Sequence, residues 1–344
     1  MHPKARFERM IRYEYWPFWL FYLPAYCYYP ILAMRAKTPL YFTVLNPIMR
    51  YGGTFLYSKY DTLQHLPKRW IPKTLRIDRD QDFEHLLEQI HKQNIDFPLI
   101  VKPDKAERGK DVEKISGEKE LKNYLENARF KSLLLQEFID YPLEIGVLFY
   151  WDTQGQPQIS SLGYKSFCKI IGDGKKTFGQ LVLKNVRIAH RVKTLKKRFK
   201  QQWNLILPIG KEILVEPIGN HNRGTQFFDG SEYYNDALLD WTANCLKNLP
   251  GFDYGRLDIK ITDWEAFQKN QGIKILEING VNAEPIHIYD QRYNLIKAYK
   301  ELFKHMKIIY ELSLHKIKNS QSPLPMRSFK KGCYQFFIQK NNTP

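Results

Sequence analysis

Cysteine is scarce in this chain, and the spacing of the few that occur excludes two kinds of site. Four cysteines are scattered along 344 residues without a Cys-x-x-Cys pair, namely Cys27, Cys168, Cys245 and Cys333. Structural zinc sites and disulfide frameworks need closely spaced or paired cysteines, so this pattern argues against both. The compartment that fits such a sequence is a reducing cytosol.

Several sequence patterns are also absent. The chain shows no internal repeat and no sustained heptad, which argues against a solenoid or a coiled coil. Its basic stretch lacks zinc-finger or helix-turn-helix context, so no specific nucleic-acid partner is expected. No cleavable signal peptide is evident. Helical and strand-like patterns alternate, which predicts an α/β protein rather than a helical bundle or a β-sandwich.

Acidic residues are too few to balance the basic ones. The chain has 53 Lys and Arg against 36 Asp and Glu, a formal net charge of +17. This excess predicts an anionic partner, which could be a nucleotide, nucleic acid, an acidic substrate or anionic lipid. Charge alone does not choose between them. The basic run within 187–200 is either a solvated helix face or an approach for an acidic substrate.

One segment, residues 16–34, has no charged side chains at all. Its length would allow a membrane span, but Pro17, Pro24 and Pro30 interrupt helix hydrogen bonding, and its Tyr and Trp residues prefer the water–lipid boundary. Two interpretations stay open for residues 13–35: a peripheral membrane contact flanked by basic residues, or an aromatic arm packed on its own domain.

Periodicity and turn residues predict the other elements. Thr177 and Gln180 fit a capping box that starts a helix reaching about residue 202, and Ser116 is a plausible N-cap. Residues 319–344 lack periodicity and predict a loosely attached basic tail. We expect helices at 79–95, 117–128, 231–248 and 289–315, strands at 97–102, 133–139, 144–151, 158–167 and 212–218, and polar loops at 103–111 and 219–230.

The most informative feature is a pair of strand-like segments, GRLDIK at 255–260 and LEIN at 276–279. Because side chains alternate across a strand, Glu277 and Asn279 should share a face, and strand pairing could bring Asp258 beside them. Carboxylate and amide oxygens are ligands that Mg²⁺ prefers. Taken alone, these residues are equally consistent with polar side chains on an edge strand.

Further polar residues follow buried strands in chain order. Lys102 ends an apolar strand and is followed by a loop with Gly109, whose backbone amides could meet phosphate oxygens. Glu137 ends one strand-like run and Glu144 starts the next. Each carboxylate could separately be an ordinary surface residue.

With these residues the chain resembles the ATP-grasp superfamily, and within it the D-alanine–D-alanine ligase-like branch of carboxylate–amine ligases. The resemblance runs from about Lys59 to Pro285 and rests on FPLIVKPDKAERGKDV, QEFIDYPLE, GRLDIK and LEING. IIGDGKKTFGQL is similar to a turn of the cyanophycin-synthetase-like relatives. The resemblance implies an ATP-grasp fold, in which two α+β subdomains clamp ATP between antiparallel sheets. The implied units are an aromatic, abbreviated N-terminal domain at 1–58, the small subdomain at 59–145, the metal-bearing subdomain at 146–318 and the tail at 319–344.

The resemblance also implies residue roles. Lys102 and the loop of Gly109 and Lys110 would bind phosphates, with Lys59 as an earlier nucleotide lysine and either Lys165 or Lys169 as another cation. The adenine edge would meet Glu137, Phe138, Ile139 and Asp140, and the ribose would meet Glu144. Asp258, Glu277 and Asn279 would hold two Mg²⁺ ions, for which Mn²⁺ is expected to substitute. Weaker candidates for substrate contact are His221, Asn222, Arg223 and His287.

The implied reaction is ATP-dependent joining of a carboxylate to an amine through an acyl phosphate, on a cell-envelope or amphiphilic substrate, in the cytoplasm or at the inner membrane face. Arg256 is either the residue that stabilises the acyl phosphate or a salt-bridge partner of the metal carboxylates. The loop ERGKDV and the sequence Gly-Val-Asn-Ala-Glu-Pro after Asn279 depart from the dipeptide ligases. A membrane-associated ATP-binding scaffold that does not ligate is the alternative.

Overall fold

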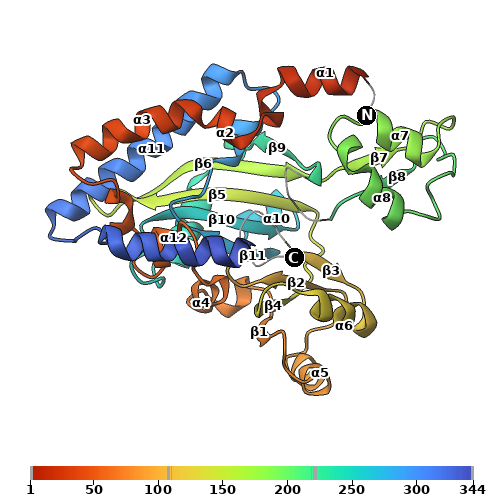
Figure 1. Cartoon of the computed structure of the whole chain (residues 1–344), viewed down its shortest axis with the longest axis horizontal. Helices are drawn as coiled ribbons and strands as arrows, with labels where there is room; N and C mark the ends of the chain where they lie inside the picture. The colour runs from red at the N-terminus through yellow and green to blue at the C-terminus, as the bar shows by residue number, and fades with distance from the viewer. Residues whose placement is uncertain (1–2, 107–108, 110, 218, 220–222, 342–344) are drawn as a thin grey trace.

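Two antiparallel sheets organise the fold (Figure 1). The computed structural model describes residues 3–106, 109, 111–217, 219 and 223–341. A four-stranded sheet lies beside a five-stranded one, with helices packed against each. The mixed α/β class predicted from the sequence is confirmed, and paired antiparallel sheets are the architecture that the ATP-grasp resemblance implies.

The smaller sheet has its own core. Its strand order is β1 (Thr74–Asp78), β4 (Ser132–Glu137), β2 (Leu99–Pro103) and β3 (Glu113–Ile115). Helices α5 (Phe83–Lys92) and α6 (Glu118–Asn127) bury one apolar stripe each against this sheet. Leu86 and Leu121 from the helices pack with Leu99 and Leu133 from the strands, and all four are fully buried.

The larger sheet presents two different faces. Its strand order is β11 (Ile273–Asn279), β10 (Tyr254–Ile261), β5 (Leu143–Trp151), β6 (Pro157–Ser166) and β9 (Gln226–Asp229). Because side chains alternate, Val147 and Phe149 pack toward α9 (Asp236–Leu246) and α10 (Trp264–Gln268), while Leu148 packs with residues of α11 (Leu295–Lys318). Helices therefore cover both faces of the sheet. The face toward α11 carries polar residues as well as apolar ones.

A third, smaller unit follows β6 in the chain. The two-stranded sheet of β7 (Lys169–Ile171) and β8 (Glu212–Leu214) packs with α7 (Phe178–Lys184) and α8 (Val192–Arg198). The predicted capping box at Thr177 is confirmed. The prediction that its helix continues to about 202 is wrong, because α7 ends at Lys184 and the chain turns to bury Ile188 and to pair Arg187 with Glu14.

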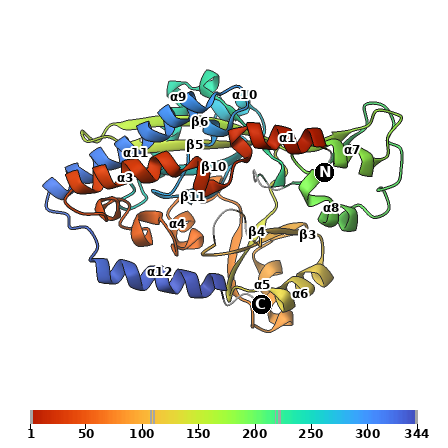
Figure 2. The same ribbon diagram turned by 45° about the horizontal axis from the view of Figure 1, so that its top comes forward.

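The aromatic N-terminal segment is helical and lies on the protein. It forms α1 (Pro3–Ile11), α2 (Phe18–Phe21) and α3 (Leu23–Arg35), and α3 runs beside α11 in both ribbon views (Figures 1 and 2). Phe21 and Leu32 are buried, whereas Trp19 and Met34 are exposed. Among the described residues, no helix has the length and apolarity needed to cross a membrane.

Most of the C-terminal segment forms a packed helix, which corrects the prediction of a loosely attached tail. Helix α12 (Met326–Asn341) packs Phe329 and Phe336 against Tyr51 and Phe55. Figure 2 shows α12 apart from α11, with α4 drawn between them. Other short helices in the described part of the chain are α4 (Lys59–Gln64) and the 3-10 turns Tyr13–Tyr15, Tyr41–Val44, Arg50–Gly53, Lys68–Trp70, Ala189–Arg191, Ser231–Tyr233 and Ile286–Tyr289.

Two further local predictions are wrong. Ser116 is not the N-cap of α6, because Gly117 takes that position and the Ser116 amide instead donates to Glu120. The expected polar loop 219–230 contains β9, which adds an edge strand to the larger sheet by pairing with β6. A four-residue edge strand offers too little alternation to be recognised in a sequence.

Candidate active site

A single large cavity collects most of the residues singled out in the sequence. Its volume is about 980 Å³, at the upper end of the range for ligand pockets. The smaller sheet contributes side chains from β2 and β4, and all five strands of the larger sheet contribute side chains. The predicted residues that line it are Lys59, Lys102, Gly109, Glu137, Phe138, Ile139, Glu144, Lys165, Arg256, Asp258, Glu277 and Asn279.

The pairing of β10 with β11 sets the acidic side chains next to each other. Asp258 lies directly opposite Glu277, and Arg256 lies opposite Asn279. The register shifts between Asp258 and Ile259, so the strand partner of Ile259 is Ile275 and Leu276 is the extra residue. This bulge turns Glu277 and Asn279 to the cavity while Ile275 stays in the core, a re-aiming that is typical of bulges.

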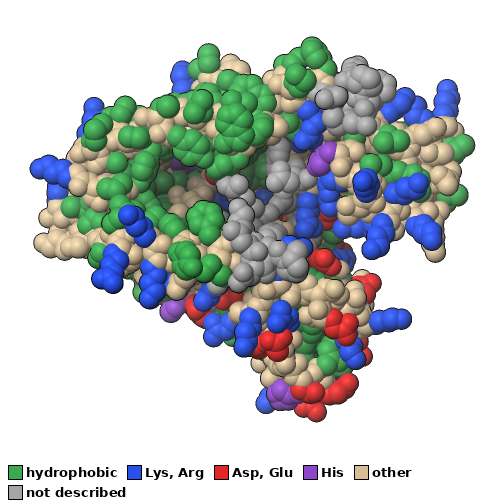
Figure 3. All heavy atoms as spheres, in the orientation of Figure 1, with side chains coloured by type: hydrophobic (Ala, Val, Ile, Leu, Met, Phe, Trp, Pro, Cys, Tyr) green, Lys and Arg blue, Asp and Glu red, His purple; other side chains and the backbone are tan. Residues whose placement is uncertain are grey.

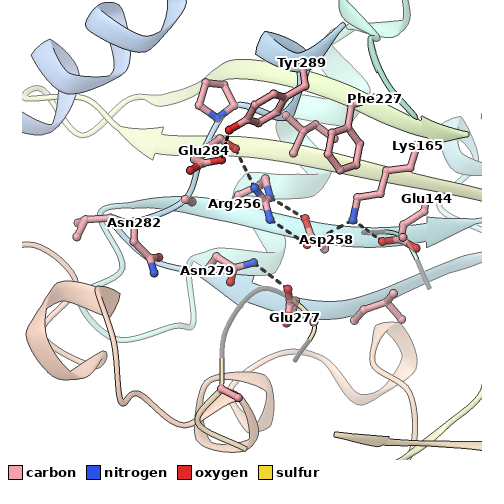
Figure 4. A pocket seen from close by; sticks show the side chains of 18 of the residues that line it. Glu144, Lys165, Phe227, Arg256, Asp258, Glu277, Asn279, Asn282, Glu284 and Tyr289 are labelled. Atoms are coloured by element: carbon pink, nitrogen blue, oxygen red, sulfur yellow. Dashed lines mark hydrogen bonds and ion pairs between the residues drawn. The ribbon is translucent and has the colours of Figure 1, made fainter. Parts of the chain in front are cut away.

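Protein cations already neutralise both carboxylates, and Figure 4 shows those beside Asp258. Arg256 pairs with Asp258 through two contacts of 2.7 and 3.1 Å, and Lys165 lies 3.6 Å from the same carboxylate. Lys59 lies 2.6 Å from Glu277. Burial by itself would raise the pKa of Glu277, but Lys59 and Lys102 lower it well below its usual value, so the group is a carboxylate at neutral pH.

The oxygen ligands fit a hard cation. Asp258, Glu277 and the amide oxygen of Asn279 converge on one wall of the cavity, and Asn279 donates to Glu277 at 3.1 Å while accepting from Tyr57 at 3.0 Å. Two carboxylates and one amide oxygen suit Mg²⁺, which retains waters and substrate phosphate oxygens as its other ligands. Within the described ranges, no group of three or more His, Cys, Asp and Glu residues could hold a metal by itself.

Lys102 is buried at the boundary between the two sheets. Its ammonium donates to Gln136 at 2.9 Å and to the carbonyl of Leu276 at 3.1 Å, so a residue of the smaller sheet touches the bulge of the larger one. Burial lowers the pKa of Lys102 to about 8, against the opposing attraction of Glu277. A cation with incomplete charge compensation in a cavity is well suited to receive an anionic ligand.

The predicted adenine and ribose residues occupy the other end of the polar region. Glu137 accepts a hydrogen bond from the Lys73 amide at 3.1 Å, and Lys114 lies 3.6 Å from the centre of the Phe138 ring. Glu144 is buried in an ion pair with Lys165, its register partner on β6. Asp140 does not line the cavity, although its neighbours Phe138 and Ile139 do.

The structure separates the two alternative lysines. Lys165 lines the cavity with its side chain 5% exposed, whereas Lys169 is half exposed on β7 and pairs with Glu212. β6 ends at Ser166, so the chain passes from one sheet to another within the three residues between the lysines. Lys169 therefore lies outside the cavity, and Lys165 is the lysine that adjoins the acidic residues.

The predicted substrate residues and the phosphate-binding candidate Lys110 fall in three places. His221, Asn222 and Lys110 lie outside the described residues. Arg223 does not line the cavity, but it donates to the carbonyls of Gly109 and Val112 and so joins the third unit to the glycine loop. His287 is buried beside Ser161 and Glu301 and does not line the cavity, although its neighbour Ile286 does.

Sequence reasoning missed some cavity residues. Lys260 lines the cavity and donates to the carbonyl of Tyr141 at 3.0 Å. It stands two residues after Asp258, so the same strand alternation could have identified it. Tyr57 does not line the cavity but contacts its residue Asn279, and it carries no comparable local signal, because it reaches Asn279 only through tertiary packing.

Comparison with known proteins gives structural likenesses only. No protein-family model matches the chain, and no curated protein matches it. The structure is similar to a D-alanine–D-alanine ligase from Bacillus anthracis, with 16% identity over 77% of this chain and 69% of that chain and a TM-score of 0.45. It is also similar to a D-Ala:D-Ser ligase from Enterococcus faecalis, with 13% identity, 73% and 61% coverage, and a TM-score of 0.43.

A bifunctional glutathione synthetase from Pasteurella multocida is a third similar structure, with 14% identity over 72% of this chain and a TM-score of 0.39. The chain spans 36% of that synthetase and 61% of the D-Ala:D-Ser ligase. With TM-scores below 0.5, these likenesses carry no argument about function, which has to come from the site itself.

Proposed function

We propose that this protein is an ATP-grasp ligase that uses ATP and Mg²⁺ to activate a carboxylate as an acyl phosphate, which an amine then attacks. One observation carries the proposal. A single cavity between two antiparallel sheets brings together a buried lysine from the smaller sheet, Lys102, and the facing residues Asp258 and Glu277 of the larger sheet. Buried cations beside hard oxygen ligands are suited to a nucleotide triphosphate with its metal.

The residues would divide the work along the cavity. Phe138, Ile139 and the backbone near them would receive the adenine, and Glu144 would accept from the ribose hydroxyls. Lys102 and Lys59 would contact the phosphates, and their buried positions fix these cations before ATP binds. Asp258, Glu277 and Asn279 would hold Mg²⁺, which supplies charge neutralisation on the transferred phosphoryl group.

In the proposed reaction, a carboxylate oxygen attacks the γ-phosphorus of ATP and the bond to the ADP oxygen breaks. The amine then attacks the acyl carbon, and inorganic phosphate leaves. The chain's contribution is positioning and charge, because phosphoryl transfer needs little covalent help. Arg256 would face the acyl phosphate. The sequence left two roles open for this residue. Its ion pair with Asp258 is consistent with the salt-bridge role, and we propose that it has the catalytic role as well.

The test is ADP formation that depends on a carboxylate. A panel of carboxylic acids is incubated with ATP, Mg²⁺ and hydroxylamine, which traps an acyl phosphate as a hydroxamate. Glu277→Ala and Lys102→Ala should abolish turnover, whereas Lys269→Ala, which changes an exposed lysine of the loop after α10, should leave it unchanged. Turnover that survives both cavity substitutions contradicts the assignment. ATP binding with no turnover across the panel would instead favour the scaffold alternative.

We also propose that the protein contacts the cytoplasmic membrane face peripherally through residues 13–35. The support is a row of exposed apolar side chains, including Trp19 at 63%, Leu23 at 51% and Met34 at 71% exposure, beside Arg35 and Lys37. Exposed aromatic and aliphatic residues next to basic ones favour anionic lipid surfaces.

Point substitutions test this contact, because deletion of the segment would also remove the buried Phe21 and Leu32. The combined change Trp19→Ser and Met34→Ser should release the protein from vesicles of anionic lipid in a sedimentation assay. Ile209→Ser removes an even more exposed apolar side chain outside this segment and should not release the protein. Equal binding by all three proteins contradicts a contact through this segment.

A further inference from the structure

The cavity continues beyond its charged end into a second region, which we call the aromatic arm. Two helices line this arm with residues spaced to share one helical face. Helix α3 and the residue before it contribute Tyr22, Ala25 and Tyr29, and α11 contributes Leu302, Met306 and Ile309. Residues three and four apart lie on the same side of a helix, so each helix turns one continuous face to the arm. On the face of the molecule that Figure 3 shows, hydrophobic side chains gather around a hollow.

A chain of contacts joins the arm to the charged end. Arg256 pairs with Asp258 and also donates to the carbonyl of Glu284 at 2.8 Å. The carboxylate of Glu284 accepts from the hydroxyl of Tyr289 at 2.9 Å. Tyr289 in turn lies 5.8 Å, centre to centre, from Phe21, which belongs to the N-terminal helices. Arg256 therefore stands where the polar region meets the aromatic one.

One buried polar group in the cavity wall has an unused hydrogen-bonding site. His305 lies on α11 between Leu302 and Met306 and is 3% exposed. Its Nδ1 atom is 3.1 Å from the hydroxyl of Tyr254, whereas its Nε2 atom has no hydrogen-bond partner within the described part of the chain. Burial lowers the pKa of His305 to about 3, so the ring is neutral and in either tautomer Nε2 can form one more hydrogen bond.

A buried polar atom without a partner is costly, and in native proteins it often marks the place of a ligand. Besides His305 and the buried hydroxyl of Tyr22, the arm offers aromatic rings and aliphatic side chains, which favour an apolar ligand. Helix α3 also has apolar residues on its outer side, where Leu23 and Met34 are exposed, so an amphiphilic compound would meet apolar side chains on both sides of this helix.

We propose that the aromatic arm binds the extended apolar body of the carboxylate substrate, and that His305 Nε2 forms a hydrogen bond with a polar group on that body. The substrate class is thus a long-chain carboxylic acid that carries one hydroxyl or carbonyl group along its chain. Placement of its carboxylate beside Arg256 rests on the proposed function. The arm and its selectivity for apolar chains rest on the lining residues alone.

Calorimetric titration with unbranched acids from butyrate to decanoate tests the arm. Each methylene buried there should increase affinity by up to about fourfold, which corresponds to roughly 0.8 kcal/mol per methylene. Met306→Trp should remove this gain by filling the arm, and Ile309→Gln should weaken it. Lys307→Trp adds the same ring on the exposed side of α11 and should keep the wild-type series. If the affinity of the wild-type protein does not rise with chain length, the proposal is wrong whatever the variants show.

A hydroxyl scan tests the role of His305. Decanoic acids with a hydroxyl at different carbons are compared with decanoate itself. At least one should bind the wild type about fivefold more tightly, the effect of one net hydrogen bond. His305→Phe should abolish this gain while it preserves the chain-length series. If no hydroxyl position improves binding, or if the gain persists in His305→Phe, the assignment to His305 is wrong.

Nucleotide binding separates failure of this inference from failure of the proposed function. ATP affinity should be unchanged in Met306→Trp and reduced in Lys102→Ala. If ATP does not bind while the chain-length series holds, the arm is a ligand site and the ligase proposal fails. If ATP binds and turns over with short carboxylates only, the ligase proposal stands and the arm is not its substrate site.

Discussion

Lys102 gives a pH dependence that can be worked out from its surroundings. Its pKa of about 8 lies below the usual 10.5, because burial outweighs the attraction of Glu277. ATP phosphates would stabilise the charged ammonium and raise that pKa again on binding. The protein should therefore take up a proton when it binds ATP at alkaline pH.

The size of the effect follows from the free-protein pKa. At pH 7 about nine-tenths of Lys102 is protonated, and at pH 9 about one-tenth, so ATP affinity should fall about tenfold between these values. Lys59 does not add to the change, because Glu277 outweighs the effect of its burial and raises its pKa further above this range. Isothermal titrations in two buffers of different ionisation enthalpy measure the affinity and the proton uptake, with EDTA present so that metal binding does not intervene.

Lys102→Arg is the matched control, since arginine stays charged throughout this range. The ATP affinity of this variant should not fall tenfold between pH 7 and pH 9, and the side chain at position 102 should take up no proton when ATP binds. The pH dependence of ATP itself cancels in the comparison of the two proteins. If wild type and Lys102→Arg show the same dependence, then Lys102 does not meet the phosphates with a lowered pKa.

Three stability predictions follow, each measured as the free energy of unfolding in denaturant. Gly53→Ala should cost more than about 2 kcal/mol, because its φ is 81° and the new Cβ would lie 2.6 Å from a backbone atom of the loop after β11. Its control is Gly155→Ala, which has a similar φ of 76° but open space around the new Cβ and should cost about 1 kcal/mol. Equal costs would contradict this close approach. Glu216→Gln should cost roughly 3–5 kcal/mol, because the fully buried carboxylate pairs with three arginines, and the exposed Glu212→Gln should cost under about 1 kcal/mol. Thr177→Ala should cost about 1 kcal/mol through the lost capping box, and an unchanged stability would show that the cap is not needed.

Strand alternation was sufficient to predict the core of the site. It placed Glu277 and Asn279 on one face and Asp258 beside them, because this arrangement depends only on local geometry and one strand pairing. The bulge at Leu276 was not predictable, since a register shift depends on how two strands pack in the folded protein. The choice between Lys165 and Lys169 needed the end of β6, which sequence periodicity locates only approximately.

Helix α12 was missed although a signal was present. Phe329, Cys333 and Phe336 have the spacing of one helical face, and they are the residues that α12 packs against Tyr51 and Phe55. The basic residues around them hid this stripe. The aromatic arm was beyond sequence reasoning for a different reason. Its two walls come from α3 and α11, which are more than 250 residues apart in the chain, and only the fold brings them together.

Oxygen transfer from the substrate tests the central claim most directly. The carboxylate that best stimulates ADP formation is labelled with ¹⁸O in both oxygens, and the inorganic phosphate released is analysed by mass spectrometry. Ligation through an acyl phosphate predicts one ¹⁸O atom in each phosphate, and loss of the labelled phosphate in Glu277→Ala. Phosphate that carries no ¹⁸O would contradict activation of the carboxylate by ATP at this site.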